Sequence, residues 1–509
     1  MPIGMVQMIQ LDRQSRIPLY RQIRDQLRAM ILAGTLPEGA QLPPERRLAE
    51  RLGVNRGTVT NAYRELVADG LAEACVGRGT VVCRLDIDAD VTGLALPAAP
   101  PWAELFAPQP RWLRHPLLGD LAALAARRNV ISLAAGVPAP DLYPTRAFGQ
   151  VVGDLLAEGD PARLGPCPTE GIEPLRRAIA ERLMDPAAGV SPHEILIVTG
   201  SQQGLDLIAR AFIDPGDAVI IEAPTYLGAL QTFGAAGARL LSVPLDEHGL
   251  HLGVLQGLLA RHRPKFIYTL PTCQNPSGVT QSLDHRRGLL DLANRHGVPV
   301  IEDDPYGPLY YGESPPPPLK ALDSHIQTIY LSTFSKIMFP GLRLGWVAAP
   351  RPVIERLSSI KQRVDLYGNS LAQWATATFI QDGHLDTHLA RMREIYPRRR
   401  QVTVDALRQH CPELEFRVPD GGFNLWCRLP AGLKSRDLLM EAGRQGVAFV
   451  PGEVFYAEAG GEDAMRLNFS SQPGPRIREG ITRLGRALEV LKSRREQEPA
   501  VMGFAQPLV

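Results

Sequence analysis

Apolar residues recur along this chain with two different spacings, and the spacings separate two regions. Ile23, Leu27 and Ile31 are four residues apart, which places them on one face of an α-helix. From residue 130 to about residue 494, short apolar runs such as 218–221 alternate with segments of helix length. Strands separated by helices predict a mostly parallel sheet with helices on its faces.

The N-terminal pattern predicts three short helices followed by a β-hairpin over residues 71–82. The first helix can start with Pro18 at its first position, and Gly34 ends it. Asn55 can cap the third helix with its side chain. Four residues fall near the start or on the outer face of that helix, where a recognition helix places side chains in the major groove of DNA: Arg56, Gly57, Thr60 and Asn61.

The stretch LPPERRLAERLGVNRGTVTNAYRELVADGL, residues 42–71, resembles the winged helix-turn-helix of the GntR family of transcriptional regulators. The resemblance implies an α+β DNA-binding domain over residues 16–83 that reads double-stranded operator DNA as a dimer. In that family the residues matching Arg46, Arg56, Thr58 and Gly77 contact DNA. The candidate DNA-binding residues are Arg46, Asn55, Arg56, Gly57, Thr58, Thr60, Asn61, Gly77 and Arg78.

Composition and charge limit the kinds of binding site that the chain can have. The 509-residue chain has a net charge of +1, so any affinity for DNA must be local. Residues 16–83 hold ten Arg against seven Asp or Glu, a balance of +3. None of the six cysteines has CxxC spacing, which argues against a metal site or a disulfide framework.

Other segments bear on organisation and location. A proline-rich stretch over residues 84–127 is expected to be a semi-rigid linker. Residues 495–509 are expected to form a disordered tail. The N-terminus has no signal-peptide pattern and the sequence has no run of 18 apolar residues, so we expect a cytoplasmic protein without a membrane segment.

Lys336 is the strongest candidate for chemistry. It lies in the run Thr333-Phe334-Ser335-Lys336, and Arg343 follows seven residues later. A lysine amine can form an imine with an aldehyde, and hydroxyls and a guanidinium can hold a phosphate on the same molecule. The run therefore predicts a site for a phosphorylated aldehyde cofactor.

Three further residues suit the ring of such a cofactor. Asp303 follows an apolar strand and can keep a pyridine nitrogen protonated, so that the ring acts as an electron sink. Tyr306 and Asn275 can hydrogen-bond the oxygen at position 3 of the ring, which lowers the pKa of the lysine imine.

Four other residues suit the phosphate, the ring face and a carboxylate. The run 200–204, GSQQG, opens a helix whose free N–H groups form an anion site, so Ser201 and Gln202 are candidate phosphate ligands. Tyr226 can stack on the ring. Arg466 can bind a substrate or effector carboxylate with its planar fork.

The runs GSQQ, PTY, NPSG, EDDPY, TFSK, PGLRLG and RLNFS occur in this order and resemble the active site of fold type I aminotransferases, which use pyridoxal 5'-phosphate. The resemblance covers about residues 130–492 and implies an aminotransferase-like domain over residues 128–494. The implied fold is α/β with a mostly parallel sheet and a smaller C-terminal α+β subdomain. It implies catalytic roles for Lys336, Asp303 and Tyr306. The implied cofactor-binding residues are Ser201, Gln202, Tyr226, Asn275, Asp303, Tyr306, Thr333, Ser335, Lys336 and Arg343.

The fusion of the two regions resembles the MocR subfamily of transcriptional regulators. It implies a homodimeric regulator that senses pyridoxal phosphate or a small amino compound through an aldimine at Lys336. Two alternatives stay open at this point: a true aminotransferase with a secondary DNA module, and a DNA-binding protein with a vestigial cofactor site. Pro166 stands where these domains normally have a tyrosine that reaches the phosphate of the partner subunit, which puts efficient turnover in doubt more than cofactor binding.

Overall fold

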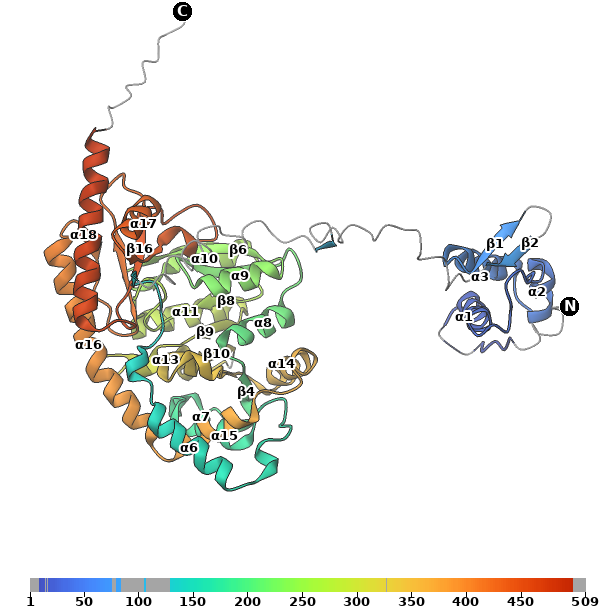
Figure 1. Ribbon diagram of the computed structural model, residues 1–509, viewed down its shortest axis with the longest axis horizontal. Helices are drawn as coiled ribbons and strands as arrows, with labels where there is room; N and C mark the ends of the chain where they lie inside the picture. Colours follow the sequence, from blue (N-terminus) through green and yellow to red (C-terminus); the bar gives the residue numbers. More distant parts are fainter. Residues whose placement is uncertain are drawn as a thin grey trace, which may run out of the picture. The chain divides into compact units, whose positions relative to one another are not determined.

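The computed structural model describes residues 9–13, 15, 17–75, 79–83, 105–106, 129–325 and 327–497. The chain divides into two compact units, Met1–Ala107 and Pro108–Val509, and each is described by itself (Figure 1). Among the described residues, no helix is long and apolar enough to cross a lipid bilayer. The predicted linker over residues 84–127 falls outside the described residues apart from 105 and 106.

The N-terminal unit is a three-helix bundle with a hairpin. Its elements are α1 (Leu19–Leu32), α2 (Glu45–Leu52), α3 (Arg56–Ala68), β1 (Ala72–Cys75) and β2 (Gly79–Val82). Ile23, Leu27 and Ile31 are fully buried or nearly so, as the four-residue spacing predicts. Gly53 ends α2 in the left-handed region with φ 62°, where glycine carries no penalty for a Cβ atom. The strands β1 and β2 pair antiparallel, which confirms the winged helix-turn-helix fold.

The larger unit is built on an eight-stranded sheet with the order β4-β11-β10-β9-β8-β5-β6-β7. Strands β4, β10, β9, β8, β5 and β6 run parallel, whereas β11 and β7 pair antiparallel to their neighbours. The strands are β4 (Ile195–Val198), β5 (Ala218–Ala223), β6 (Arg239–Asp246), β7 (Gly249–Leu250), β8 (Ile267–Thr269), β9 (Val300–Asp303), β10 (Thr328–Thr333) and β11 (Gly345–Ala348).

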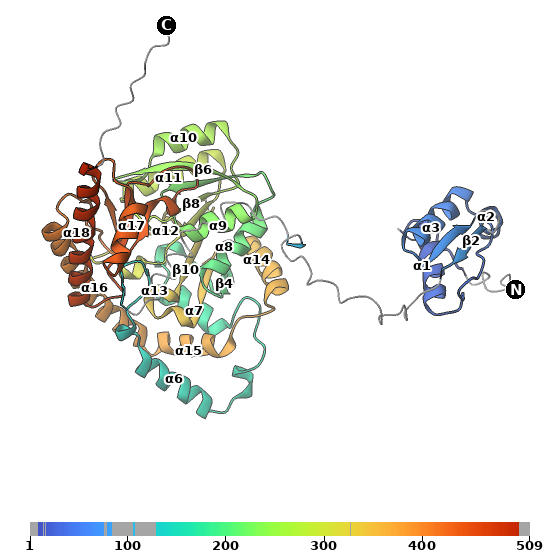
Figure 2. The ribbon, with the colours of Figure 1, turned by 45° about the horizontal axis from the view of Figure 1, so that its top comes forward.

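Helices cover this sheet. They are α6 (Thr145–Ala157), α7 (Glu173–Arg182), α8 (Ser201–Phe212), α9 (Leu227–Ala235), α10 (Leu252–Arg261), α11 (Leu283–His296), α12 (Leu319–Leu322), α13 (Phe334–Ile337), α14 (Arg351–Val364) and α15 (Ser370–Gln381). Helix α15 packs against α6 and α7 at one end of the unit (Figure 2). Strands β4, β8, β9, β10 and β11 are buried along their whole length, because helices shield both faces of the sheet.

A smaller C-terminal subdomain completes the unit. Its four-stranded sheet has the order β12-β13-β16-β15, from β12 (Glu415–Phe416), β13 (Asn424–Arg428), β15 (Val450–Pro451) and β16 (Ala464–Asn468). Strand β14 (Val447–Ala448) pairs with β3 (Ile131–Ser132). Helices α16 (His384–His410), α17 (Ser435–Arg444) and α18 (Gly474–Gln497) complete the subdomain, and α16 packs along α18 (Figure 1). Helix α18 extends into the predicted tail at residues 495–497, and residues 498–509 lie outside the described part.

Candidate functional site

The carboxyl ends of the parallel strands bring the predicted site residues together. Asp303 ends β9 and Thr333 ends β10, while Asn275 follows β8, Tyr226 follows β5 and Ser201 follows β4. In sheets of this kind, ligands bind in the crevice outside these strand ends.

A cavity of about 240 Å³ lies at this edge of the sheet. All ten residues predicted to bind the cofactor line it, and Leu270, Pro305 and Pro340 complete its wall. Arg466 and Pro166 are not among the lining residues that the structure describes. The predicted cofactor-binding residues therefore lie around one cavity. The first and the last of them, Ser201 and Arg343, are more than 140 residues apart in the chain.

Asp303 is a buried carboxylate in the lining of this cavity. The Tyr268 hydroxyl donates a hydrogen bond to its Oδ2 atom at 2.6 Å, and the residue is 2 % exposed. Its Oδ1 atom has no hydrogen-bond partner within the described part of the chain. Burial raises the pKa of Asp303 to about 7. A buried acceptor without a partner suits a ligand that brings a proton donor.

Lys336 belongs to the short helix α13 and lines the cavity. Its Nζ atom donates a hydrogen bond to the carbonyl oxygen of Gly136 at 2.7 Å. Burial, followed by the positive charge of Arg466, lowers the pKa of Lys336 to about 8. The amine is therefore neutral in a substantial fraction near pH 8, which is the form that attacks an aldehyde.

The cavity lining also includes the groups of an anion site. Helix α8 begins there at Ser201 with its first N–H groups free of intrahelical partners. The Arg343 Nη2 atom donates to the carbonyl oxygen of Thr199 at 3.0 Å. Thr333 caps α13 and its hydroxyl donates to the Ser335 hydroxyl oxygen at 3.1 Å. A guanidinium, two hydroxyls and a helix N-terminus are suited to a phosphate dianion.

Gln202 and Tyr226 are already hydrogen-bonded to each other and to α9. The Tyr226 hydroxyl donates to Gln202 Oε1 at 3.3 Å, and Gln202 Nε2 donates to the Thr232 hydroxyl oxygen at 2.7 Å. The side-chain amide of Gln202 is thus held by α9. Its backbone at the second position of α8 remains part of the anion site.

Arg466 of the C-terminal subdomain is hydrogen-bonded to Asn275, which follows β8 of the large sheet. Arg466 Nη1 donates to Asn275 Oδ1 at 2.9 Å, and Arg466 Nη2 donates to the carbonyl oxygen of Ala134 at 2.8 Å. The Phe455 ring centre lies 5.1 Å from the guanidinium carbon. Among the described residues, the buried Nε atom of Arg466 has no partner. Tyr306 is 1 % exposed, and burial raises its pKa to about 12, so it stays a hydroxyl donor.

The N-terminal unit exposes most of the predicted DNA-binding side chains. Arg46 and Arg56 have side chains 85 % and 70 % exposed, and Gly57 and Asn61 are exposed as well, while Thr58 and Thr60 are half-buried. The Thr60 hydroxyl donates to Glu45 Oε2 at 2.8 Å, and Arg56 Nε approaches the same oxygen at 3.3 Å.

Asn55 has a helix-capping role in the N-terminal unit. Its Oδ1 atom accepts from the Gly57 N–H at 2.9 Å, as predicted for a cap of α3. This contact uses the side-chain oxygen of Asn55 within the N-terminal unit. Gly77 and Arg78, the predicted tip of the hairpin, lie outside the described residues.

Each of the two units matches a known protein family. Residues 128–484 match the family described as aminotransferase class I and II, and residues 19–82 match the bacterial regulatory proteins of the gntR family. The probable rhizopine catabolism regulatory protein MocR of Rhizobium meliloti is 32% identical over 494 residues, which cover 96% of this chain and 97% of that protein. The chain belongs to the MocR-type regulators, in which a GntR helix-turn-helix is fused to an aminotransferase domain.

Two further relatives match the larger unit. Aromatic-amino-acid aminotransferase 1 of Thermococcus litoralis is 40% identical over 377 residues, covering 73% of this chain and 90% of that protein. The crystal structure of LysN, an alpha-aminoadipate aminotransferase of Thermus thermophilus, superposes with a TM-score of 0.72 at 37% identity, covering 77% of this chain and 99% of that one. The family and these relatives depend on pyridoxal phosphate, and homologues of this kind are typically dimers.

The cavity of this MocR-type regulator fits pyridoxal phosphate. Asp303 Oδ1 would supply an acceptor for a protonated ring nitrogen, and Lys336 would supply an amine for the aldehyde. Arg343 and the start of α8 supply a cradle for the phosphate. We find no polar group in this lining, as far as the structure describes it, whose chemistry opposes the cofactor.

Some functional contacts could not be found from sequence. Tyr268, which holds Asp303, lies in an apolar strand and has the same pattern as a core residue. The Gly136 carbonyl that holds Lys336 comes from 200 residues earlier in the chain. Asn424, whose Nδ2 atom donates to the Tyr306 hydroxyl oxygen at 3.4 Å, comes from the C-terminal subdomain.

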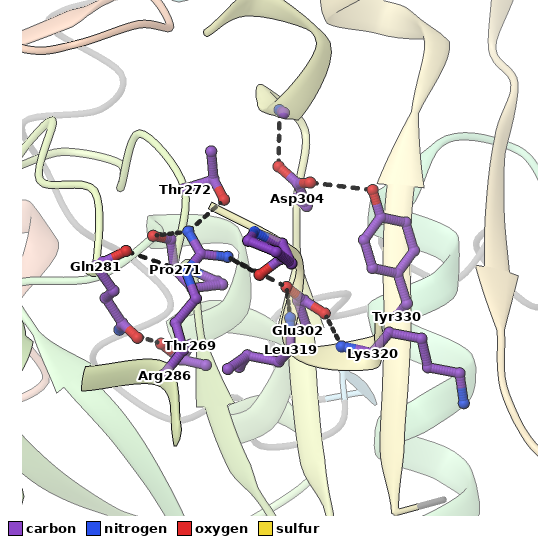
Figure 3. A network of polar contacts seen from close by, with 12 residues as sticks. Thr269, Pro271, Thr272, Gln281, Arg286, Glu302, Asp304, Leu319, Lys320 and Tyr330 are labelled. Carbon is purple, nitrogen blue, oxygen red and sulfur yellow. Dashed lines mark hydrogen bonds and ion pairs between the residues drawn. The ribbon is translucent and has the colours of Figure 1, made fainter. Parts of the chain in front are cut away.

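The run Glu302-Asp303-Asp304 has two roles on opposite sides of β9. Successive side chains of a strand point to opposite faces, so Asp303 faces the cavity while its neighbours face away. Figure 3 shows Arg286 held against Glu302 and against Pro271 and Thr272. Glu302 accepts from the N–H groups of Leu319 and Lys320, and Asp304 accepts from the Tyr330 hydroxyl and the Gly307 N–H, as drawn in part in Figure 3. This buried network fixes the strand end that carries Asp303.

Proposed function

We propose that this chain regulates transcription by binding operator DNA with its N-terminal unit and a cofactor with its C-terminal unit. The observation that supports this most is the cavity that Lys336, Asp303 and the groups of an anion site line together. Among the described residues, the Oδ1 atom of Asp303 has no hydrogen-bond partner there. The proposed signal is pyridoxal phosphate itself or a small amino compound that takes the place of Lys336 on it.

Each residue has a proposed role in holding the cofactor. Asp303 accepts from the ring nitrogen, and Tyr306 and Asn275 donate to the ring oxygen. Ser201, Gln202, Thr333, Ser335 and Arg343 hold the phosphate, and Tyr226 covers the ring face. When bound, the cofactor supplies an aldehyde and an electron-withdrawing ring. Lys336 would supply the amine for this aldehyde, and Asp303 would hold the proton of the ring nitrogen.

Arg466 is the proposed ligand for a carboxylate on the effector. Its Nη1 and Nη2 atoms are held by Asn275 and Ala134, so the guanidinium has a fixed orientation. Its Nε atom is buried and, within the described residues, has no partner. A carboxylate that enters can take Nε and exchange with one of the existing acceptors. An amino acid or a related compound satisfies both Lys336 and Arg466.

Regulation needs a link between effector binding and DNA affinity. An effector shifts DNA affinity only if it binds one conformation of the protein more tightly than another. Couplings of this kind are typically about 1–3 kcal/mol. We propose that the regulator acts as a homodimer, as GntR-type heads bind two half-sites of an operator.

A second candidate function is transamination, with DNA binding secondary. It is favoured by the presence of Lys336, Asp303 and Arg466 together, and by the 40% identity to an aromatic-amino-acid aminotransferase. Steady-state turnover with a panel of amino donors and a keto acid separates the two functions. Turnover on the order of 1–10³ per second, typical of enzymes, would favour transamination.

The regulatory function is tested by fluorescence anisotropy on DNA from upstream of the gene for this chain. We expect a pool of candidate amino acids, added to the cofactor-loaded protein, to change DNA affinity about 5- to 150-fold. Arg466→Ala is expected to abolish the response while DNA binding without effector is unchanged. A response by Arg466→Ala equal to that of the unmodified protein would rule out this carboxylate route. If the cofactor alone changes affinity and no amine adds to it, the cofactor is the signal.

A further inference from the structure

We infer that Gln203 is a positioning residue for the phosphate end of the cavity, held in turn by Asp365 and the buried Lys361. The inference rests on the proposed cofactor role of the cavity and adds residues that lie outside it. Within the described part of the chain, none of these three side chains lines the cavity. Their effect on a ligand must therefore pass through other groups.

Gln203 bridges two segments with its side-chain amide. It is the third residue of α8, and its Oε1 atom accepts from the backbone N–H of Thr199 at 2.7 Å. Its Nε2 atom donates to Asp365 Oδ2 at 2.8 Å. Both functional ends of the amide are thus used, and the amide orientation follows from these partners. The bridge therefore joins Thr199, which lies just before the start of α8, to the C-terminal end of α14.

The Thr199-Gly200 peptide in turn sets the position of both anion-binding elements. The carbonyl oxygen of Thr199 accepts from Arg343 Nη2 at 3.0 Å. Gly200 has φ 79° and caps α8, and a Cβ atom at this position would lie 2.7 Å from Arg343 Nη2. Because the backbone passes so close to the guanidinium, a shift of Thr199 displaces Arg343 and the first N–H groups of α8 together.

Asp365 is a rigid anchor for this bridge. It caps the C-terminus of α14, and its Oδ1 atom accepts from Lys361 Nζ at 2.9 Å. The Lys361 side chain is 1 % exposed, whereas that of Asp365 is 23 % exposed. A buried ammonium holds its carboxylate firmly, because breaking the pair would leave a charge without compensation in a poorly solvated place. The anchor therefore transmits little motion to Gln203.

This arrangement predicts an effect that depends on the phosphate of the ligand. Groups that are held in place before binding lose less entropy when the ligand arrives. Loss of the bridge loosens Thr199, so Arg343 and the start of α8 bind a phosphate less well. Asp303 and Lys336 make no hydrogen bond to Thr199 or Gln203 among the described residues, so we expect their contacts with the ring and the aldehyde to stay unchanged.

The test compares pyridoxal 5'-phosphate with pyridoxal, which lacks the phosphate, in absorbance titrations of the cofactor-stripped full-length chain. For Gln203→Leu we expect the affinity for pyridoxal phosphate to fall about tenfold, as for one lost hydrogen bond to a charged group. The affinity for pyridoxal is expected to stay within about twofold of the unmodified protein. Gln256→Leu, an exposed glutamine on α10, is the matched control and should change neither affinity.

A pair of conservative variants keeps the test independent of folding defects. Gln203→Glu keeps an acceptor for Thr199 but places a carboxylate against Asp365, so it should lower the selectivity for the phosphate. Adding Asp365→Asn restores one donor and one acceptor across the bridge and leaves one carboxylate near Lys361. The double variant should therefore recover most of the selectivity.

Three results would overturn the inference. An unchanged ratio of the two affinities in Gln203→Leu would show that the bridge does not position the phosphate site. Equal losses for pyridoxal phosphate and pyridoxal would show a general structural role. Failure of the double variant to recover selectivity over Gln203→Glu would remove Asp365 from the bridge. If the unmodified protein binds no pyridoxal phosphate, the proposed function fails as well, and this outcome is distinct from the other three.

Discussion

The two units present their functional side chains to solvent in opposite ways. In the N-terminal unit, the candidate DNA contacts Arg46 and Arg56 are exposed and lie beside nearby carboxylates. In the C-terminal unit, Asp303 and Lys336 are enclosed, and burial moves the pKa of each toward neutrality. An exposed arginine keeps its charge and attracts DNA phosphates over a distance. A buried group whose pKa lies near 7 is partly uncharged at neutral pH, and this form can take part in proton transfer or attack an aldehyde.

This difference in exposure determines how each unit responds to amino-acid substitutions. Exposed side chains contribute little to the free energy of unfolding, so the candidate DNA-binding residues can be substituted with small effects on stability. The cavity groups are held by buried networks, so their function and the stability of the unit are linked. We therefore expect substitutions in the C-terminal unit to change its stability, and substitutions on the exposed surface of the N-terminal unit to change DNA affinity.

The largest effect is expected for the buried network behind Asp303. Arg286→Ala removes a fully buried guanidinium and leaves Glu302 without its ion partner. We expect a loss of about 3–5 kcal/mol in the free energy of unfolding of the C-terminal unit. Urea unfolding followed by tryptophan fluorescence measures this loss. Arg287→Ala, at the next residue with a side chain 61 % exposed, is the control and should change the value by about 0.5 kcal/mol or less.

The next effect concerns pH and Asp303. Burial raises its pKa in the folded protein to about 7, above the unfolded value near 4, so the folded state binds the proton more tightly. The stability that this proton binding contributes is present at low pH and is lost as pH rises from about 4 through about 7. We expect Asp303→Asn to flatten this loss in the cofactor-free protein by on the order of 1–4 kcal/mol. Denaturant unfolding at pH 5 and pH 8 measures it, and the same slope in both proteins would contradict the burial argument.

A smaller effect is expected on DNA affinity at the exposed surface. Arg56→Ala should weaken binding to the operator by about 1–3 kcal/mol and leave the cofactor absorbance and the stability of the C-terminal unit unchanged. Gel-shift titrations give the affinity. Arg28→Ala removes the same charge from α1, where the side chain is 52 % exposed, and is the control. Equal losses from both variants would mean that α3 is not the recognition helix.

The smallest effect is expected at the carboxylate beside the recognition helix. Glu45 Oε2 accepts from the Thr60 hydroxyl and lies 3.3 Å from Arg56 Nε. Glu45→Gln removes a negative charge next to the DNA surface and releases Arg56. We expect operator affinity to increase by about 0.2–1 kcal/mol at low salt and the gain to shrink as salt is added. A decrease in affinity would show that Glu45 is needed to orient Arg56.

The sequence predicts the site well where one short run contains both the reactive group and its neighbours. The runs around Lys336 and Ser201 follow this rule, and so does the spacing of Ile23, Leu27 and Ile31 in α1. In these cases local geometry decides which side chains are adjacent. The order of the motifs, which resembles that of fold type I aminotransferases, indicates which runs meet in the site.

The sequence does not predict contacts that depend on how distant segments approach one another. Tyr268 looks like a core residue of β8 until β9 places Asp303 beside it. Of the pair Gln202 and Gln203, the second bridges to Asp365, which lies 162 residues away in the chain. The side-chain amide of Gln202 is held by Thr232 of α9, which lies 30 residues away in the chain. These partners are set by packing of the sheet and helices, which no local pattern records.

The most direct test of the account is reduction of the cofactor-loaded protein with borohydride, followed by proteolysis and mass spectrometry. Reduction makes the bond between a lysine and the cofactor permanent, so the labelled peptide identifies the lysine. The buried amine of Lys336, with its pKa lowered to about 8, predicts one labelled peptide that contains Lys336. Lys336→Ala should remove the label and the visible absorbance of the bound cofactor. A label on another lysine, or full labelling of Lys336→Ala, would contradict the account.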